Sequence, residues 1–215
     1  RVEKVVSGLK DPWSIAFLPD GGMLFTERPG RLRVFRDGVL EPEPVAGVPE
    51  VRYRGQGGLL DVVLHPDFAT NRLIYLSFSK PIGTGTEATT AVVRGRFEND
   101  RLTNVEEIFE AKAWSSGGNH FGSRMVFDRD GYLFITVGDR AVQDRVQQVV
   151  ETGNPVHRPA QPPPHVRQVR VQSRRHDVAV QQPLQRLLQR HDGPLELHHL
   201  ALELVDVGDV GWLAG

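Results

Sequence analysis

The sequence predicts an all-β protein built as the first two to three blades of a β-propeller, followed by a tail of different composition. One pattern occurs three times: an apolar strand, a turn that contains Asp, and a second apolar strand. The turn residues Asp20, Asp67 and Asp130 lie 47 and 63 positions apart. Propeller blades repeat at roughly 40 to 50 residues, and loop insertions lengthen individual repeats. The spacing therefore favours a propeller, with a β-sandwich as the alternative.

The first copy predicts two strands over 13–18 and 23–27, separated by a turn at Gly21. A third strand is expected over 31–36, where polar and apolar residues alternate as they do in a half-buried strand. Asp37-Gly38 then predicts a tight hairpin turn, because Gly adopts positive φ at no steric cost.

The second and third copies predict the inner strands of two further blades. Two more β-rich segments between these copies are expected to form the outer strands of the second blade. The predicted strands of both copies, in chain order, cover residues 59–65, 73–78, 89–97, 105–110, 125–127 and 132–137.

Composition excludes several classes of function. The chain has 215 residues and a net charge of −1, so it carries no basic surplus for nucleic acid or an anionic membrane. No apolar run approaches the roughly 20 residues that span a bilayer. Cysteine is absent, which excludes disulfides, a thiolate nucleophile and Cys-ligated metals. Because the chain starts at Arg1 without a signal peptide, we expect a mature or truncated product.

Composition changes near Arg140, which divides the chain into 1–140 and 141–215. All Phe, Tyr, Ile, Met and Lys residues precede this point, whereas six of the eight His follow it. A segment without these apolar residues has little material for a core. The tail resembles GC-rich DNA translated out of frame, and the alternative is a low-complexity or disordered extension.

His120 is the strongest candidate for a chemical role. It lies in the Gly-rich segment 117–122, directly before a predicted strand, and Asp139 ends the next strand. Two consecutive antiparallel strands bring these positions to the same sheet edge. A carboxylate there can fix the tautomer of a His base. An ordinary packing His beside a turn Asp explains the same pattern, with Arg140 then a solvated neighbour.

The segment 55–61 supplies a second candidate, because its glycines place the Gln56 amide next to an inner strand. The alternative is that Gln56 caps a loop and the glycines only make the turn. Asp61, Asp67 and Asp130 are interpreted as turn and loop residues rather than metal ligands. No EF-hand-like spacing occurs, so no metal ligand is predicted from the residues.

Together these segments resemble the soluble quinoprotein glucose/sorbosone dehydrogenases, a family of PQQ-dependent aldose sugar dehydrogenases. The resemblance covers residues 3–140 and is carried, in family order, by segments 9–21, 26–31, 55–61, 65–68, 119–124 and 137–140.

This resemblance implies a six-bladed propeller that uses PQQ and calcium to oxidise the C1 hydroxyl of an aldose to a lactone. By resemblance, His120 matches the general base, Asp139 the carboxylate that orients it and Gln56 an amide that binds the sugar. Asn119 matches a further substrate-binding position where relatives carry another polar residue. The resemblance also implies an external electron acceptor and a periplasmic or secreted location.

The family's cofactor-binding segments are not found after Asp139, so no PQQ or calcium ligand is assigned in this chain. We therefore expect an incomplete oxidoreductase domain that is inactive by itself. The alternative is a non-catalytic, propeller-like binding module with a disordered tail. The frameshift hypothesis predicts that another reading frame beyond codon 140 restores a family-like β-rich sequence.

Overall fold

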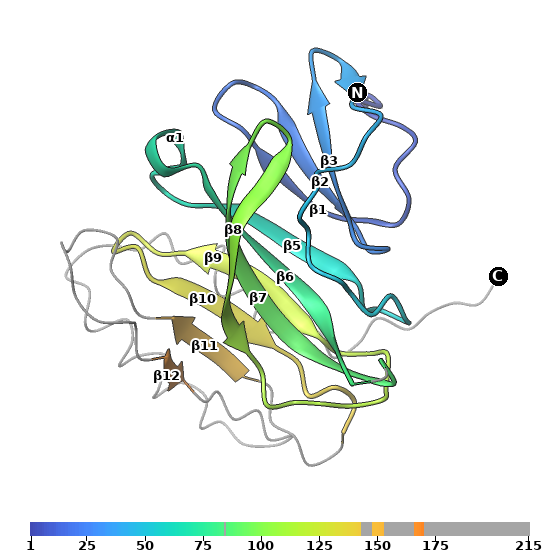
Figure 1. Cartoon of the computed structure of the whole chain (residues 1–215), viewed down its shortest axis with the longest axis vertical. Helices are drawn as coiled ribbons and strands as arrows, with labels where there is room; N and C mark the ends of the chain where they lie inside the picture. The colour runs from blue at the N-terminus through green and yellow to red at the C-terminus, as the bar shows by residue number, and fades with distance from the viewer. Residues whose placement is uncertain (84, 143–147, 153–165, 170–215) are drawn as a thin grey trace. The chain divides into compact units, whose positions relative to one another are not determined.

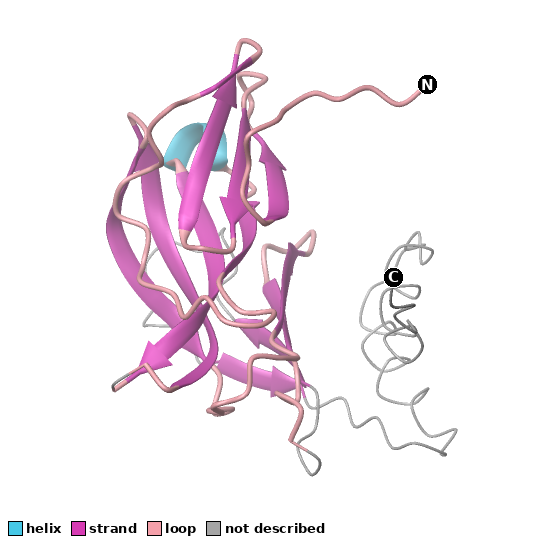
Figure 2. Ribbon diagram, turned by 90° about the vertical axis from the view of Figure 1, so that its right-hand side faces the viewer, coloured by secondary structure: helices cyan, strands magenta, loops and turns pink. Residues whose placement is uncertain are grey.

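The computed structural model describes residues 1–83, 85–142, 148–152 and 166–169. These residues form three four-stranded antiparallel sheets and one short helix (Figures 1 and 2). Every sheet keeps its strands in chain order, the arrangement of a propeller blade. The all-β prediction is confirmed, and the sheets are called blades 1, 2 and 3 below. No helix in the described residues is long and apolar enough to span a membrane.

Blade 1 follows the predicted strands closely. Its last turn places Asp37 at φ 51° and Gly38 at φ 81°, the two left-handed residues of a tight hairpin. The predicted Asp-Gly turn is therefore confirmed. The strands of blade 1 are β1 (Pro12–Phe17), β2 (Met23–Glu27), β3 (Arg31–Arg36) and β4 (Val39–Leu40).

Blade 2 contains the longest strands of the described residues. The turn expected at Asp67 closes into one helical turn, α1 (Phe68–Asn71). Its outer hairpin extends further than predicted, because Asn99 and Asp100 both adopt left-handed φ and close a tight turn between the strands. The strands of blade 2 are β5 (Leu59–Leu64), β6 (Leu73–Ile82), β7 (Glu87–Glu98) and β8 (Arg101–Glu110).

Blade 3 continues beyond the compositional break at Arg140. Its first two strands, β9 (Gly122–Phe127) and β10 (Leu133–Val137), were predicted. β10 also pairs with β11 (Gln148–Thr152), which pairs with β12 (Val166–Val169). Two strands of this sheet thus come from the segment that composition assigned to the tail. The division at 140 stays a prediction, since most of 141–215 lies outside the described residues.

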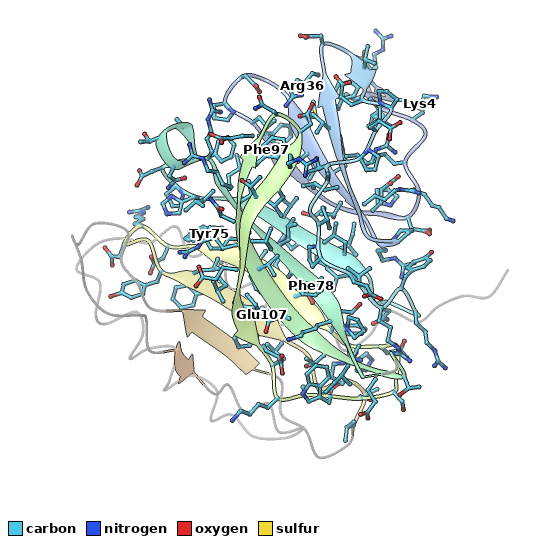
Figure 3. All side chains as sticks on the ribbon, viewed as in Figure 1. Lys4, Arg36, Tyr75, Phe78, Phe97 and Glu107 are labelled. Carbon is cyan, nitrogen blue, oxygen red and sulfur yellow. The ribbon has the colours of Figure 1, made fainter. Side chains whose placement is uncertain are left out.

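The first three strands of blade 2, β5 to β7, are largely buried, whereas its last strand β8 is mostly exposed. Ile74 and Leu76 pack against blade 1, whereas Tyr75 between them packs against blade 3. Of the side chains labelled in Figure 3, Phe78 and Phe97 belong to the core shared with blade 1. Because alternate residues of a strand face opposite sides, one strand contributes to both cores. The blades therefore stack face to face.

Candidate functional site

His120 and Asp139 meet beyond the paired ends of β9 and β10. The backbone N–H of Gly138 donates to the carbonyl of Phe121 at 3.1 Å, which extends the pairing past β9. The two side chains then lie on the same edge, with His120 Nδ1 2.8 Å from Asp139 Oδ1. The contact expected from the strand order is therefore present.

The tautomer of His120 follows from its partner. A carboxylate has no proton to donate, so Nδ1 of the neutral ring must carry the proton and Nε2 must be the acceptor. Asp139 Oδ1 also accepts the backbone N–H of Ala141 at 2.8 Å, which fixes the carboxylate. The His120 side chain is 51% exposed and that of Asp139 25%, so the imidazole can reach a solute.

Gln56 reaches the same loop from blade 2. Its Oε1 accepts the backbone N–H of His120 at 2.9 Å, and its own backbone N–H donates to the carbonyl of Gly118 at 2.7 Å. Gln56 is an exposed residue. Gln56 therefore holds the loop, as the simpler sequence interpretation expected, while sugar binding by its amide stays a prediction.

Two glycines are required by close backbone contacts at this edge. A Cβ on Gly138 would lie 1.9 Å from the carbonyl oxygen of His120, and one on Gly55 would lie 2.6 Å from that of Gly118. Both distances are far below any real contact. Gly55 therefore lets the loop before β5 approach the loop that carries His120. Gly138 lets the chain after β10 approach the backbone of His120.

Asn119 precedes His120 and is exposed. Its backbone carbonyl accepts a hydrogen bond from the Arg140 guanidinium. Arg140 thus fixes the main chain at Asn119, while the side chain of Asn119 stays at the surface. Its predicted contact with substrate stays a prediction.

Arg140 is the residue that sequence reasoning placed wrongly. The alternative interpretation of the sequence made it a solvated neighbour of Asp139, but it is only 1% exposed. Its guanidinium lies over the Phe121 ring, 3.3 Å from the ring centre, and binds carbonyl oxygens of the loop. The available signal was the Gly-rich loop itself, because its bare carbonyls need donors once they are buried.

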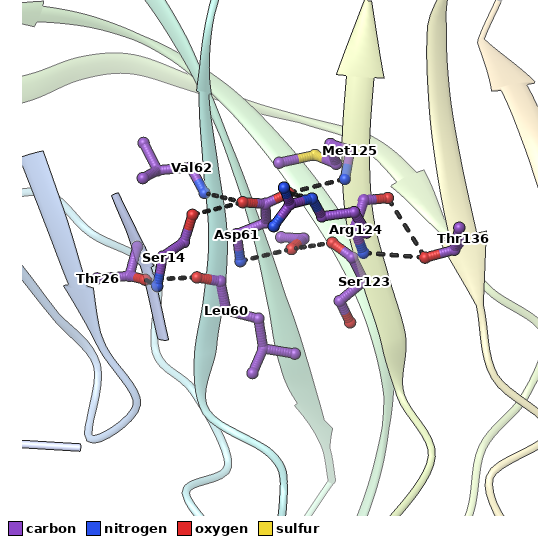
Figure 4. Close-up of polar contacts among 10 residues, drawn as sticks. Ser14, Thr26, Leu60, Asp61, Val62, Ser123, Arg124, Met125 and Thr136 are labelled. Carbon is purple, nitrogen blue, oxygen red and sulfur yellow. Dashed lines mark hydrogen bonds and ion pairs between the residues drawn. The ribbon is translucent and has the colours of Figure 1, made fainter. Parts of the chain in front are cut away.

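Asp61 also departs from its prediction as a turn residue, since it lies inside β5 with a side chain 3% exposed. Figure 4 shows how its carboxylate joins three blades. It accepts the Ser14 hydroxyl of blade 1 at 2.6 Å and the Met125 N–H of blade 3 at 2.8 Å. It also accepts the N–H of Val62 in its own strand at 3.0 Å. Burial raises the pKa of Asp61, although the Ser14 hydrogen bond acts to lower it.

A cavity of about 370 Å³ lies where the inner strands β1, β5 and β9 converge. Its lining includes Trp13, Asp61 and Arg124. The lining does not include His120, so the imidazole–carboxylate pair and the Asp61 cluster are separate features of the inner strands.

The cations near His120 do not form a binding site for an anionic cofactor. Arg28 donates to the carbonyl of Gly55, Arg52 to those of Gly85 and Ser116, and Arg140 to that of Gly117. Each of these guanidinium groups therefore binds backbone oxygens. Among the described residues, no group of three or more His, Asp or Glu side chains could hold a metal ion. The described residues alone do not fit a carboxylate-bearing quinone or a calcium ion.

Chain-ordered four-stranded sheets with an imidazole–carboxylate pair at one edge define a partial β-propeller with an exposed polar site. The chain belongs to the glucose/sorbosone dehydrogenase family, whose model matches residues 9–160. This match includes every predicted site residue and passes the compositional break at Arg140 by twenty positions.

Proteins similar to this chain are named aldose sugar dehydrogenases. It is 46% identical over 152 residues to aldose sugar dehydrogenase YliI of Escherichia coli, covering 69% of this chain and 41% of that protein. A solved structure of the soluble aldose sugar dehydrogenase from E. coli in its apo form is 45% identical, with a TM-score of 0.62. That match covers 67% of this chain and 44% of the other.

The PQQ-bound form of an aldose sugar dehydrogenase from Streptomyces coelicolor is also similar. It is 25% identical, with a TM-score of 0.60, over 70% of this chain and 47% of that one. The chain thus spans less than half the length of each of these relatives.

Proposed function

We propose that this chain carries the proton-accepting and sugar-contacting part of an aldose sugar dehydrogenase site. The reaction is oxidation of the C1 hydroxyl of an aldose to a lactone, with PQQ as the redox cofactor. The observation that carries the proposal is the 2.8 Å contact between Nδ1 of the exposed His120 and Oδ1 of Asp139. It lies in a chain that belongs to the glucose/sorbosone dehydrogenase family.

In this proposal His120 acts as the general base, which its contact with Asp139 supports. Asp139 holds the proton of Nδ1, so the lone pair of Nε2 faces outward and accepts the proton of the C1 hydroxyl. As the ring becomes positively charged, the carboxylate 2.8 Å away stabilises the imidazolium. A positioned base of this kind contributes roughly 10²–10⁴-fold to a rate. Asp139 acts through His120 and is a positioning residue in this scheme.

Gln56 and Asn119 are proposed to contact the sugar. Both are exposed and flank His120, from blade 2 and from the loop itself. The Oε1 of Gln56 is bound to the His120 backbone, so its amide nitrogen is the group that can donate to a sugar hydroxyl. A sugar held by these amides would present its hydroxyl next to Nε2.

PQQ and calcium enter this proposal through the family alone. The guanidinium groups of Arg28, Arg52 and Arg140 bind backbone carbonyls, and no described residue is assigned to PQQ or calcium. The proposal therefore assigns proton transfer and sugar binding to this chain and no electron-transfer step. An external electron acceptor and a periplasmic or secreted location also stay predictions.

A chimera tests the proposal directly. Residues 1–142 of this chain replace the aligned part of the E. coli aldose sugar dehydrogenase, and dye reduction is measured with glucose, PQQ and calcium. The chimera is expected to reduce the dye, and His120→Asn is expected to lower kcat by roughly 10²–10⁴-fold. The present chain alone is expected to show no turnover under the same conditions.

Two controls accompany this experiment. Glu106→Ala removes an exposed, ion-paired carboxylate of blade 2 and is expected to leave the rate unchanged. Circular dichroism must show that each variant is folded. A folded His120→Asn chimera with full activity would refute the proposal and favour the non-catalytic binding module.

A further inference from the structure

We propose that Arg140 is a positioning residue for the base, because its buried guanidinium fixes the loop that presents His120 to Asp139. The inference deepens the proposed function and rests on it for its catalytic meaning. The effect of Arg140 on the tautomer of His120 can be measured in this chain without any catalytic turnover.

The contacts of Arg140 converge on the loop that carries His120. Its Nη2 donates to the carbonyl of Gly117 at 2.8 Å, and its Nη1 donates to the carbonyl of Asn119. Its backbone N–H donates to the carbonyl of His120 at 3.2 Å. The guanidinium also covers the ring of Phe121. One residue therefore contacts His120 itself and both of its chain neighbours.

The side-chain type matters because Arg140 binds carbonyls on both sides of Gly118, whereas Gln56 binds the loop at Gly118 and His120. Gly117 and Gly118 offer no side chains for packing; the carbonyl of Gly117 accepts from Arg140, and that of Gly118 accepts from the backbone of Gln56. A guanidinium presents several donors in a fixed planar fork and stacks on an aromatic ring, whereas an ammonium is a point charge. The 1% exposure of Arg140 shows that this fork is fully enclosed.

The position of Arg140 in the chain couples the two members of the pair. Arg140 follows Asp139 directly, and its backbone has φ 60°, a left-handed conformation that turns the chain sharply there. The same short segment therefore carries the carboxylate and the group that holds the imidazole's loop. If the guanidinium were lost, we expect the Nδ1–Oδ1 contact to loosen while the blades remain folded.

The tautomer of His120 reports this directly. The whole chain is labelled with ¹⁵N-histidine, and its ring nitrogens are observed by NMR near pH 8.5, about two units above the ordinary His pKa of about 6.5. The His120 signals are those lost in His120→Asn. In the unmodified chain we expect the Nδ1–H form. In Arg140→Met the ratio of Nδ1–H to Nε2–H forms is expected to fall roughly tenfold, the equivalent of one lost hydrogen bond.

Arg72 offers a matched control. Its guanidinium lies over the ring of Phe68, 5.6 Å from the centre, and its φ is 58°, close to that of Arg140. Because Arg72 belongs to blade 2 beside α1, Arg72→Met is expected to leave the His120 signals unchanged. Arg140→Lys keeps a cation near Phe121 but loses the fork, so an intermediate ratio is expected.

A folded Arg140→Met with the tautomer ratio of the unmodified chain would overturn the proposal. If Arg140→Met does not fold, Arg140→Lys decides, and an unchanged ratio there overturns it equally. In the chimera, Arg140→Lys is expected to lower kcat with little change in KM, as a positioning role requires. An active His120→Asn chimera would instead remove the proposed function and leave the tautomer result intact.

Discussion

Two aspartates in neighbouring blades illustrate how one type of side chain serves two purposes. Asp61 lies within β5, is 3% exposed and accepts hydrogen bonds from all three blades. Asp139 lies two residues beyond β10, is 25% exposed and binds the imidazole of His120. The first carboxylate is surrounded by backbone and hydroxyl donors, whereas the second has a partner that reaches solvent.

The difference comes from position along the strand rather than from residue type. Inside a strand, a carboxylate between stacked blades can be stable only if every oxygen finds a donor. Past the end of a strand, the backbone turns away and leaves room for a side-chain partner. The same blade geometry therefore places a buried carboxylate that joins three blades within a strand and an imidazole–carboxylate pair beyond the strand's end.

Removing Asp139 is expected to have the largest effect. In the chimera, Asp139→Ala frees the His120 ring to change tautomer, and kcat is expected to fall roughly 100-fold. The free energy of unfolding in urea should change by less than about 1 kcal/mol, since the His120 side chain is 51% exposed and solvent screens the pair. Steady-state kinetics and a urea titration measure the two effects. A large loss of stability with normal kcat would reverse the comparison.

Removing Asp61 is expected to act on stability instead. Asp61→Ala leaves the Ser14 hydroxyl and the backbone N–H of Met125 without their acceptor in a buried site. Because each orphaned group costs about 1–3 kcal/mol, a loss of roughly 3 kcal/mol is expected in urea unfolding of the chain. Glu106→Ala, which removes an exposed carboxylate of blade 2, is the control and should cost much less. Equal losses of unfolding free energy in both variants would contradict the role of Asp61 in holding the three blades together.

Gln56 sharpens the comparison from the neighbouring blade. Gln56→Ala removes the acceptor of the His120 N–H, and hydrogen exchange of this amide is expected to accelerate roughly fivefold, the equivalent of ~1 kcal/mol. Gln56→Glu keeps an oxygen at the same place and should preserve slow exchange. Unchanged exchange in Gln56→Ala would show that the loop is held without this contact.

The smallest expected effect is a change in how the free energy of unfolding depends on pH. Burial raises the pKa of Asp61 above its ordinary 3.8. Asp61 therefore keeps its proton to a higher pH in the native state than in the unfolded state. The stability that its protonated form contributes is present below pH 3.8 and is lost as pH rises through the native pKa. Asp61→Asn should remove that loss, which urea titrations at several pH values measure. Parallel pH curves for both proteins would contradict it.

Glu27 gives the opposite sign. Burial acts to raise the pKa of this carboxyl, but hydrogen bonds from Arg31 and the Lys10 N–H outweigh it and hold the pKa below 4.5. Its contribution is therefore present above pH 4.5 and lost as pH falls through the native pKa. In the same titrations, Glu27→Gln should remove a stability loss on the acid side.

Features that depend on local chain chemistry could be predicted from the sequence. The Asp37-Gly38 turn, the repeated strand pairs and the meeting of His120 with Asp139 all follow from residues close in sequence or from consecutive strands. The repeat spacing also agrees with contacts between blades. Ser14 and Asp61 are 47 positions apart, and Asp61 and Met125 are 64 apart, close to the 47 and 63 of the Asp turns.

Features that depend on stacking between blades could not be predicted. An Asp in a strand and an Arg after a strand both suggest solvent, because the partners that bury Asp61 and Arg140 come from other blades. Composition also suggested a limit at Arg140, but β10 continues its pairing with β11 in the tail segment. A strand can pair through its backbone whatever its side chains are, so composition is a poor guide to the last strands of a sheet.

Buried hydroxyls fasten blade 2 to the segment that carries His120. Thr90 in β7 donates to the carbonyl of Phe121 at 2.7 Å, and Ser77 in β6 donates to that of Ser123 at 2.7 Å. His120 belongs to the chain of blade 3, yet its immediate successor is anchored to blade 2. The imidazole is therefore anchored from two blades at once, because hydroxyls of blade 2 hold the residues after it while Asp139 and Arg140, beyond β10 of blade 3, hold the ring and its backbone.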